Sequence, residues 1–538
     1  MEAARRLFRS LRSPAACAAA CVVGLVGPRV ASGTPPVRID CDPTSAGPGL
    51  RSLRGSPPVI RDAEVPTILG AARPELHHSR WSVGGGDFAI RATLLLESIE
   101  GRGLGLTFDG GRLELDQPEA GGVLRGTLFG GGSFTIAESR PPAIRPGAPF
   151  ELVLAREDGR LMLWLDGIEA GSIGMRDIPL GRLGFSLGGG RLRVLACEIE
   201  GDLVELPLPR SVFETPDGDI DEHRDPVLAS DGTTVLLGAI AATTRDDGSV
   251  LESLRIRRLG NGPAPTAAET ADLGGLEPEL ASLGHDGRRW TLAVQTALER
   301  GFSRRVEILA STDGLRFERV ATVETPPIRL SSGAASRLAS GSLAFTATVV
   351  EADGPRPALL VADEGDWKVR LLSDEPSGEP TLIGDGRVLV RRAGSLDRST
   401  FALRDAAVEP AAPGDATPPK PVDAIGYRGA PVTPAAIRLG PATWGALQPA
   451  PGHPNPLSLL AGDDRGVAWS RVVELWGGPS GAVTAVHRGD ERIVLFEGGD
   501  ATRREHVLLL VLGEEDIERL EARAGTDPSV SEPPRPRP

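Results

Sequence analysis

Apolar and polar residues alternate over short stretches in the first half of the chain, and turn signals separate these stretches. Between residues 87 and 201 they include "DFAIRATLLL", "GLGLTFDGGRLELD" and "FELVLAREDGRLMLWLDG", with D-G and G-G pairs at the corners. Alternation with a period of two predicts β-strands with one buried face, and such pairs predict tight hairpins. We therefore expect residues 75–207 to fold as an antiparallel β-sandwich.

A turn-bounded pair of strands recurs through the second half of the chain. Clear copies start at Arg224, Glu277, Ser331, Ser377 and Ser480, and a weaker copy, "AAIRLGPATWGALQ", starts at Ala435. The starts are roughly 45 to 55 residues apart, which is close to the length of one propeller blade. The pattern predicts an all-β chain in which residues 208–522 form a six-bladed β-propeller. Five blades are the alternative if the weak copy is a loop.

The ends of the chain lack this strand pattern. Residues 1–33 place arginines before an Ala/Val-rich run, which predicts a secretory signal peptide. A transmembrane anchor is the alternative, but the run is shorter than the roughly 20 residues that a span needs. Residues 34–74 are expected to be a flexible linker, and residues 523–538 a disordered tail after a short charged helix. The mature chain is thus expected to be secreted, extracellular or periplasmic, without a membrane span.

Charge and cysteine content limit the classes of ligand. A net charge of -14 and a pI near 5.2 argue against a nucleic-acid partner, because phosphate contacts need clustered cations. Removal of a signal peptide leaves Cys41 and Cys197, which could form a disulfide or remain as two buried thiols. No C-x-x-C or H-x-x-x-H spacing suggests a metal site, and no cofactor is expected.

The stretch "ASTDGLRF", ending at Phe317, resembles the Asp-box of bacterial sialidases and related BNR-repeat propellers. A second stretch, "AGDDRGVAW", is similar. In such a box the Asp accepts backbone N–H bonds, Gly adopts a positive φ and the aromatic residue plugs the edge of the blade. The resemblance implies a structural corner on the outer turns, away from the axial pocket. The residues concerned are Ser311, Asp313, Gly314, Phe317, Asp464 and Trp469.

The order of strands in residues 75–207 resembles the LamG-like, concanavalin A-like jelly rolls of secreted proteins. The resemblance implies a sandwich that binds sugars, binds calcium or packs against a neighbouring domain. Trp81 and Trp164 are the candidates for a sugar-binding platform, and core positions are the alternative for both.

Resemblance to the sialidase family also implies where an active site would lie. That family grips a carboxylated sugar with three arginines and uses a Tyr nucleophile, a Glu partner and an Asp acid/base. Arg224 falls on the first arginine, Asp246 or Asp247 lies near the acid/base, and Glu497 takes the place of the Glu that braces the first arginine. First and last blades adjoin in a closed ring, so we expect an Arg224–Glu497 pair near the axis. A structural ion pair is the alternative.

Several positions depart from the sialidase pattern. The nucleophile position falls on Ser480, and Tyr427 is the only tyrosine in the chain. Arg391 or Arg392 could be the second arginine, and no arginine stands at the third position. A Ser lacks the acidity of a phenol, and no His stands beside it in the sequence to activate it.

Three functions remain open on this basis. The leading hypothesis is a secreted sialidase-like propeller that recognises glycans or another surface ligand without the family's hydrolysis. An active exo-glycosidase, acting as an exo-α-sialidase-like glycoside hydrolase through acidic residues at the axial pocket, is the first alternative, and a non-catalytic interaction scaffold is the second. The candidate carboxylates for the enzyme are Asp225, Asp246, Asp247, Glu277 and Glu279.

Overall fold

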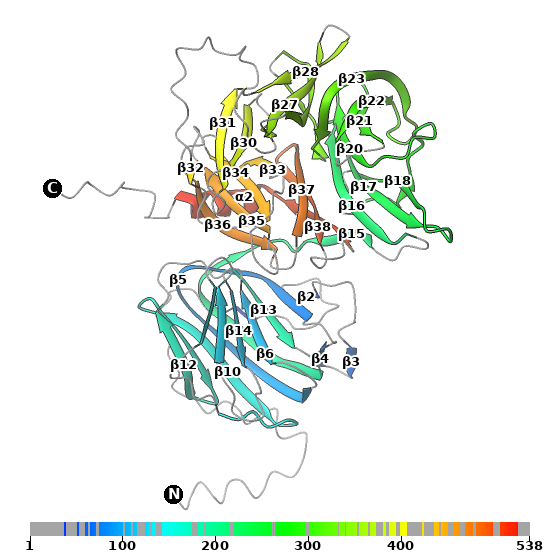
Figure 1. Cartoon of the computed structure of the whole chain (residues 1–538). Coiled ribbons are helices and arrows are strands. Elements are labelled where there is room, and N and C mark those ends of the chain that lie inside the picture. The colour runs from blue at the N-terminus through cyan, green and yellow to red at the C-terminus, as the bar shows by residue number, and fades with distance from the viewer. Residues whose placement is uncertain are drawn as a thin grey trace, which may run out of the picture.

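A computed structural model provides the structure, and all its regular elements are strands, apart from helix α2 (Glu514–Gly525), among the residues that it describes. These residues are 37–38, 51–52, 60–62, 65–70, 75–99, 103–108, 111–115, 124–128, 132–135, 142–174, 181–187, 190–214, 220–260, 262, 264–296, 302–331, 333–338, 340–351, 354–363, 366–372, 380–383, 387–393, 399–405, 422–423, 435–440, 443–449, 457–462, 469–476, 480–498 and 506–525. The chain is all-β, with a β-sandwich followed by a β-propeller (Figure 1).

The sandwich is built from strands that are linked into one hydrogen-bonded sheet system. Its strands are β1 (Val37–Arg38), β2 (Arg51–Ser52), β3 (Ile60–Asp62), β4 (Val65–Gly70), β5 (Glu75–Ile99), β6 (Leu104–Phe108), β7 (Gly111–Leu115), β8 (Leu124–Leu128), β9 (Gly132–Thr135), β10 (Pro149–Glu157), β11 (Arg160–Leu165), β12 (Ile168–Gly174), β13 (Gly181–Leu187) and β14 (Gly190–Glu205). The long strand β5 pairs with β10, β13 and β14, so it connects the layers that enclose one apolar core.

The alternating pattern and the D-G turns explain the local structure of this part. Along β11 the burial alternates, and Leu161, Leu163 and Leu165 face the core. Asp158 and Gly159 join β10 to β11 with φ values of 50° and 71°, as a two-residue turn with both central residues in the left-handed region requires. The D-G pair in the sequence therefore marks this hairpin turn.

Strands also occur in residues 34–74, where a linker is expected from the sequence. β1 and β4 pair with β14, and β2 pairs with β5. Strand pairing needs only backbone N–H and C=O groups, and segments of two to six residues are too short for a periodic apolar pattern to reveal them. Residues 1–33, Cys41 and residues 526–538 lie outside the described residues. Helix α2 extends to Gly525, past the start of the expected tail.

The strands of the propeller follow in chain order. They are β15 (Arg210–Glu214), β16 (Glu222–Ser230), β17 (Val235–Thr244), β18 (Val250–Leu259), β19 (Glu269–Thr270), β20 (Leu280–His285), β21 (Trp290–Gln295), β22 (Ser303–Ser311), β23 (Glu318–Leu330), β24 (Gly333–Ala334), β25 (Ser336–Arg337), β26 (Leu343–Glu351), β27 (Gly354–Asp363), β28 (Asp366–Leu371), β29 (Pro380–Ile383), β30 (Arg387–Ala393), β31 (Ser399–Asp405), β32 (Val422–Asp423), β33 (Ala435–Arg438), β34 (Trp444–Pro449), β35 (Leu457–Gly462), β36 (Trp469–Trp476), β37 (Ser480–Arg488), β38 (Glu491–Gly498) and β39 (His506–Leu512).

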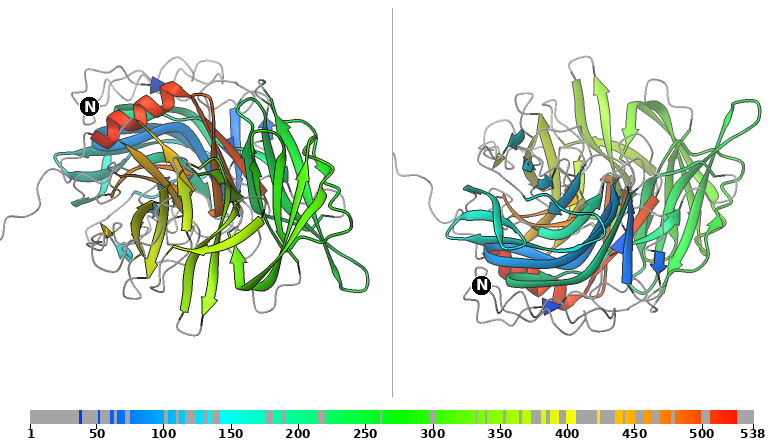
Figure 2. Two further views of the ribbon diagram at one scale, coloured as in Figure 1. Left: turned by 90° about the horizontal axis from the view of Figure 1, so that it is seen from above. Right: turned by 90° about the horizontal axis from the view of Figure 1, so that it is seen from below.

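These strands form sheets that are antiparallel apart from the β20–β24 pair, and the sheets close into a ring. Strand β15, the first of this part, pairs with β39, the last, and so completes the sheet of β37 and β38. Strand β16 lies beside β20 on one side and β37 on the other, and β33 contacts both β29 and β37. Figure 2 shows the sheets side by side in chain order, from green through yellow to orange. One sheet continues from β20 to β28 across two of the expected repeats, so the number of blades stays a prediction.

The sandwich and the propeller share packing at their junction. Leu206, just after β14, is fully buried in a core with residues of β33–β39 and with Ile517 and Leu520 of α2. The guanidinium of Arg519 donates to the carbonyl of Glu205 at 3.3 Å. The apolar face of α2 therefore attaches the end of the sandwich to the last sheets of the ring. Within the described part of the chain, no helix is long and apolar enough to cross a membrane.

Candidate functional site

The candidate site lies where the first and last sheets of the ring meet, at the start of β16. Arg224 pairs with Ile240 of β17, and the register then shifts before Val227, so Asp225 and Pro226 form a bulge. Pro226 cannot donate a hydrogen bond, and β16 is the edge strand of its sheet, where proline is tolerated. Asp225 has a φ of 50°, which is unusual for a residue with a side chain. The bulge thus re-aims the side chain of Arg224.

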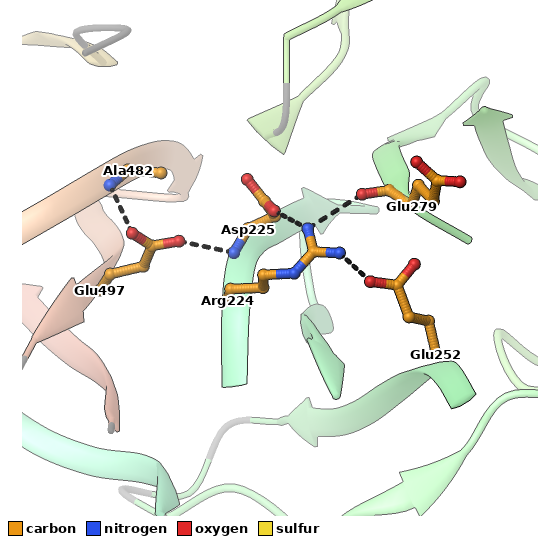
Figure 3. A network of polar contacts seen from close by, with 6 residues as sticks. All are labelled: Arg224, Asp225, Glu252, Glu279, Ala482 and Glu497. Atoms are coloured by element: carbon orange, nitrogen blue, oxygen red, sulfur yellow. Dashed lines mark hydrogen bonds and ion pairs between the residues drawn. The ribbon is translucent and has the colours of Figure 1, made fainter. Parts of the chain in front are cut away.

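The guanidinium of Arg224 is held by two carboxylates and one backbone carbonyl (Figure 3). Its Nη1 contacts Asp225 Oδ2 and donates to the carbonyl of Glu279 at 3.0 Å, and its Nη2 contacts Glu252 Oε1. Burial opposes the charged form, but Asp225 and Glu252 outweigh it and raise the pKa of Arg224. The side chains of Arg224, Asp225 and Glu252 are 18%, 11% and 16% exposed, so the cluster is largely shielded from solvent.

Glu497 joins the last sheet to the first. It lies near the end of β38, is 1% exposed, and accepts backbone N–H bonds from Asp225 at 2.7 Å and from Ala482 at 3.0 Å. A Cβ on Gly481 would lie 2.1 Å from Glu497 Oε2, so the approach of this carboxylate requires glycine there. Glu497 therefore stabilises the strained backbone of Asp225 and closes the ring at the same point.

The described contacts of Arg224 and Glu497 go to different groups, so the expected ion pair between the two stays a prediction. The ring does bring both residues to one junction, but Glu497 binds the backbone N–H of Asp225, and the ion pairs of Arg224 go to Asp225 and Glu252. The bulge separates the two, because it turns the guanidinium toward β18 and the start of β20. Sequence reasoning missed Glu252, which comes from a strand two positions away in the sheet and has no spacing signal.

Asp246 and Asp247 lie on the exposed turn between β17 and β18, at the end of the sheet that carries Arg224. Asp247 Oδ1 accepts the backbone N–H of Ser249 at 2.9 Å and its hydroxyl at 2.6 Å. These hydrogen bonds lower the pKa of Asp247. A general acid at neutral pH needs the opposite shift, so the present geometry favours a role in the turn for this residue.

The structure describes the other expected site residues only in part. Ser480 is the first residue of β37 and is 8% exposed, opposite Gly498 in the register. Arg391 and Arg392 lie on β30, opposite Phe401 and Thr400, and their side chains are not among those described. Tyr427 and Asp464 lie outside the described residues. Trp469 begins β36, opposite Gly462, and its side chain is likewise outside the description.

The corner at Ser311–Phe317, between β22 and β23, is held by its own polar groups. Asp313 Oδ1 accepts the hydroxyl of Ser311 at 2.9 Å and the backbone N–H groups of Leu315 at 2.8 Å and Arg316 at 2.9 Å. The Ser311 hydroxyl in turn accepts the N–H of Gly314 at 2.8 Å. The donors, chiefly Arg316 and Leu315, lower the pKa of Asp313 from 3.8 to about 2.

Apolar packing completes the same corner. Gly314 has a φ of 70°, and a Cβ there would lie 2.5 Å from Leu236 Cδ1 of the preceding sheet. Phe317 is 4% exposed in the core between the sheets, and its N–H donates to the carbonyl of Asp272 at 2.9 Å. The corner thus packs one sheet onto the next, and the hydrogen bonds of Asp313 hold the turn.

A segment inside the ring fills the space between β20 and β37. Strand β24 runs parallel to β20, with Ser282 Oγ donating to the carbonyl of Gly333 at 3.3 Å. Gly333 has a φ of 136°, and a Cβ there would lie 3.0 Å from Thr484 Oγ1 of β37. Strand β24 therefore lies against β16, β20 and β37 at once. In the described part of the chain, no group of three or more His, Cys, Asp or Glu side chains is arranged to hold a metal ion.

Comparisons with known proteins give similarity in solved structures only. No family model matches the sequence, and no curated protein matches it. A mutant of NanB sialidase from Streptococcus pneumoniae is 12% identical, with 84% of this chain and 98% of that chain covered and a TM-score of 0.43. Trypanosoma rangeli sialidase with the inhibitor DANA is 12% identical over 59% of this chain and 60% of that chain, with a TM-score of 0.40. The carbohydrate binding module CBM66 from Bacillus subtilis is 18% identical over 29% and 96%, with a TM-score of 0.23.

Proposed function

We propose that this protein is a secreted β-propeller protein that recognises an uncharged glycan at the Arg224 cluster, and that it does not cleave sialosides by the sialidase mechanism. The proposal rests on the ion pairs that Arg224 already makes. Its guanidinium already binds two carboxylates, and a third carboxylate, Glu497, lies at the same junction. One cation thus shares the junction with three carboxylates, two of which contact it.

This charge balance selects against a carboxylated sugar. An incoming carboxylate would approach Asp225 and Glu252 as well as Arg224, and like charges at short range repel strongly where solvent is partly excluded. Sugar hydroxyls meet no such penalty, because each hydroxyl can donate to a carboxylate and accept from a guanidinium. A neutral glycan therefore fits the cluster better than sialic acid does.

The nucleophile position points the same way. Ser480 stands where the resemblance expects tyrosine, and only 8% of it is exposed. A serine hydroxyl attacks well only when a neighbouring base activates it. Secretion belongs to the proposal because residues 1–33 have the pattern of a signal peptide. The mass of the mature N-terminal peptide would test that part.

The test compares binding and hydrolysis by the full mature chain. We expect no release of 4-methylumbelliferone from the sialoside, and binding to neutral glycans on an array that weakens at least tenfold with Glu252→Gln. Arg288→Ala is the matched control, since Arg288 is exposed on the turn between β20 and β21, at the opposite end of the sheet. Robust sialoside cleavage that Arg224→Ala abolishes would refute the proposal. Absence of any glycan binding would instead favour the interaction scaffold.

An exo-glycosidase on the same scaffold is the second candidate. Asp225 and Glu252 lie in the cluster with side chains 11% and 16% exposed, and Asp246 lies on the adjacent turn, so carboxylates from several elements share one end of the ring. A pair of carboxylates is the usual machinery of glycoside hydrolysis. Hydrolysis of a neutral aryl glycoside that is lost with Glu252→Gln and retained with Arg288→Ala would favour this candidate over simple recognition.

A further inference from the structure

Three basic side chains meet where the last sheet of the ring adjoins the sheet of β33, and we call them the basic cluster. His487 of β37 and Arg492 of β38 are directly opposite each other in the strand register, and Arg438 is the last residue of β33. The N–H of Arg438 donates to His487 Nε2 at 3.5 Å, and Arg492 Nε donates to the carbonyl of Arg438 at 2.8 Å. Three elements thus bring their basic residues together through the backbone of Arg438.

The acidic side chains around the basic cluster have other partners. Arg488 and Glu491 form the next pair in the register, so they point to the other face of the hairpin, where Arg488 Nε donates to Glu491 Oε2 at 2.7 Å. Glu521 of α2 accepts the hydroxyl of Thr443 at 3.5 Å. Among the described residues, no carboxylate forms an ion pair with the two cluster residues of this hairpin.

The charges of the basic cluster act on one another. The surrounding chain partly desolvates the imidazole, and together with the charges of Arg492 and Arg438 this lowers the pKa of His487 to about 4. Burial and the charge of Arg438 outweigh the charge of Asp490 and lower the pKa of Arg492. Two cations and a neutral imidazole therefore lie together in a chain whose net charge is -14. A bound anion would offset this local repulsion.

The members of the cluster offer hydrogen-bond donors from different directions. Because His487 accepts through Nε2, the proton of its neutral ring is on Nδ1, and the residue is exposed at the surface. Arg492 donates from Nε and Nη1 to the carbonyls of Arg438 and Asp490, which leaves Nη2 for a ligand. Donors on separate strands suit a group with oxygens in several directions. Phosphate and sulfate have such oxygens, whereas a planar carboxylate fits a single guanidinium fork.

We propose that the basic cluster is a binding site for a tetrahedral oxyanion, a phosphate or a sulfate group. Arg492 and Arg438 supply the positive charge, and His487 donates a hydrogen bond from Nδ1. The site is separate from the Arg224 cluster, because Glu497 and Arg492 lie near opposite ends of β38. It requires no assumption about the ligand of that cluster.

NMR of the histidine side chains in the full mature chain, without a histidine tag, tests the proposal. The chain has 7 histidines, and His487→Gln assigns the resonance of interest. Sodium sulfate replaces sodium chloride at constant ionic strength, so screening does not change during the titration. We expect a saturable shift of the His487 resonance with a Kd on the order of 1 mM at neutral pH.

The same titration has a pH dependence of known sign. A bound dianion stabilises the imidazolium, so saturating sulfate should raise the pKa of His487 above its value of about 4. Because the complex then binds protons more readily than the free protein, sulfate should bind several-fold more tightly at about pH 4 than at neutral pH. The variant His487→Gln should lose this dependence.

Variants of matched charge separate the site from a general attraction of anions. Arg492→Met should weaken sulfate binding at least tenfold, whereas Arg288→Met removes the same charge from an exposed turn and should leave the Kd unchanged. If Arg492→Met does not fold, Arg492→Lys keeps the charge, loses the fork and should still weaken binding several-fold. The proposal is overturned if sulfate shifts the His487 resonance no more than chloride does. It is also overturned if saturating sulfate leaves the pKa of His487 unchanged, or if the Arg492 variants bind as tightly as Arg288→Met.

Methyl phosphate and acetate define the class of ligand. If methyl phosphate binds as tightly as inorganic phosphate, the ligand is an esterified group on a larger molecule. If only the free ions bind, the ligand is a small anion, and both results support the site. Acetate that binds more tightly than sulfate would contradict the tetrahedral geometry and so the proposal.

Discussion

Replacing Arg224 by methionine should destabilise the propeller, because it leaves two carboxylates facing each other without their cation. Breaking a buried ion pair by removing one partner costs about 3 to 5 kcal/mol. The three side chains are 11% to 18% exposed, so water screens part of the repulsion and about 2 kcal/mol is expected. At about 2 °C per kcal/mol for a domain of this size, Tm should fall by about 4 °C.

A double-mutant cycle shows whether the cost comes from the unpaired charge. Glu252→Gln in the Arg224→Met background removes one of the stranded carboxylates, so the double variant should recover about 1 kcal/mol relative to the sum of the single changes. The assay is thermal unfolding followed by tryptophan fluorescence at pH 7, with Arg288→Met as the control on an exposed arginine. If the effects of the two single changes on stability simply add, or if Arg224→Met is as stable as the wild type, then the charges of Arg224 and Glu252 do not stabilise each other. The charge argument for a neutral ligand would then fail as well.

Three further predictions concern the fold around the site. Gly314→Ala should lower the free energy of unfolding by about 2 to 4 kcal/mol, because it combines left-handed strain with a clash against Leu236. The control Gly248→Ala, at a φ of 80° with open space around it, should lower it by only about 1 kcal/mol. Equal losses of stability in urea unfolding would contradict this. The folded pKa of Asp313, about 2 against 3.8, is depressed, so its stabilisation is present above about pH 4 and is lost as the pH falls toward 2. Asp313→Asn should therefore flatten the fall in Tm over that range, and an unchanged acid profile would argue against it. Leu206→Ala should lower the free energy of unfolding by about 3 kcal/mol and expose α2 to proteolysis, because it opens a cavity at the junction. If α2 instead resists proteolysis and Tm is unchanged, the junction is not a packed core.

Sequence patterns predict the parts of this fold that depend on local chemistry. Burial that alternates along β11 and the D-G turn at Asp158 follow directly from side-chain alternation and from the need for a positive φ. The ring also follows from the repeats, because each copy is too small to bury its own faces. The strands within residues 34–74 are not predictable in this way, since their pairing depends on the edge that β14 and β5 offer.

The candidate site is predictable in its position but not in its contacts. Repeats at both ends of the ring place Arg224 and Glu497 at one junction. Which atoms meet there depends on the bulge at Asp225 and on the absence of a side chain at Gly481. Both are local features of the backbone. Matching residue types at the two ends of the ring does not predict them. The partner Glu252 is set by three-dimensional packing of β16 against β17 and β18, which spacing along the chain does not encode.

Under the proposed function, the closure of the ring and the choice of ligand depend on the same carboxylate, Glu497. Glu497 satisfies the N–H of Asp225 and so holds that residue at a φ of 50°, which turns Arg224 toward Glu252 and Glu279. In this orientation the guanidinium is already held by Asp225 and Glu252. The backbone hydrogen bond to Glu497 therefore supports the geometry in which Arg224 is already neutralised by Asp225 and Glu252. A variant that relaxes the bulge, rather than one that adds cations, is the change by which this scaffold would gain affinity for an acidic sugar.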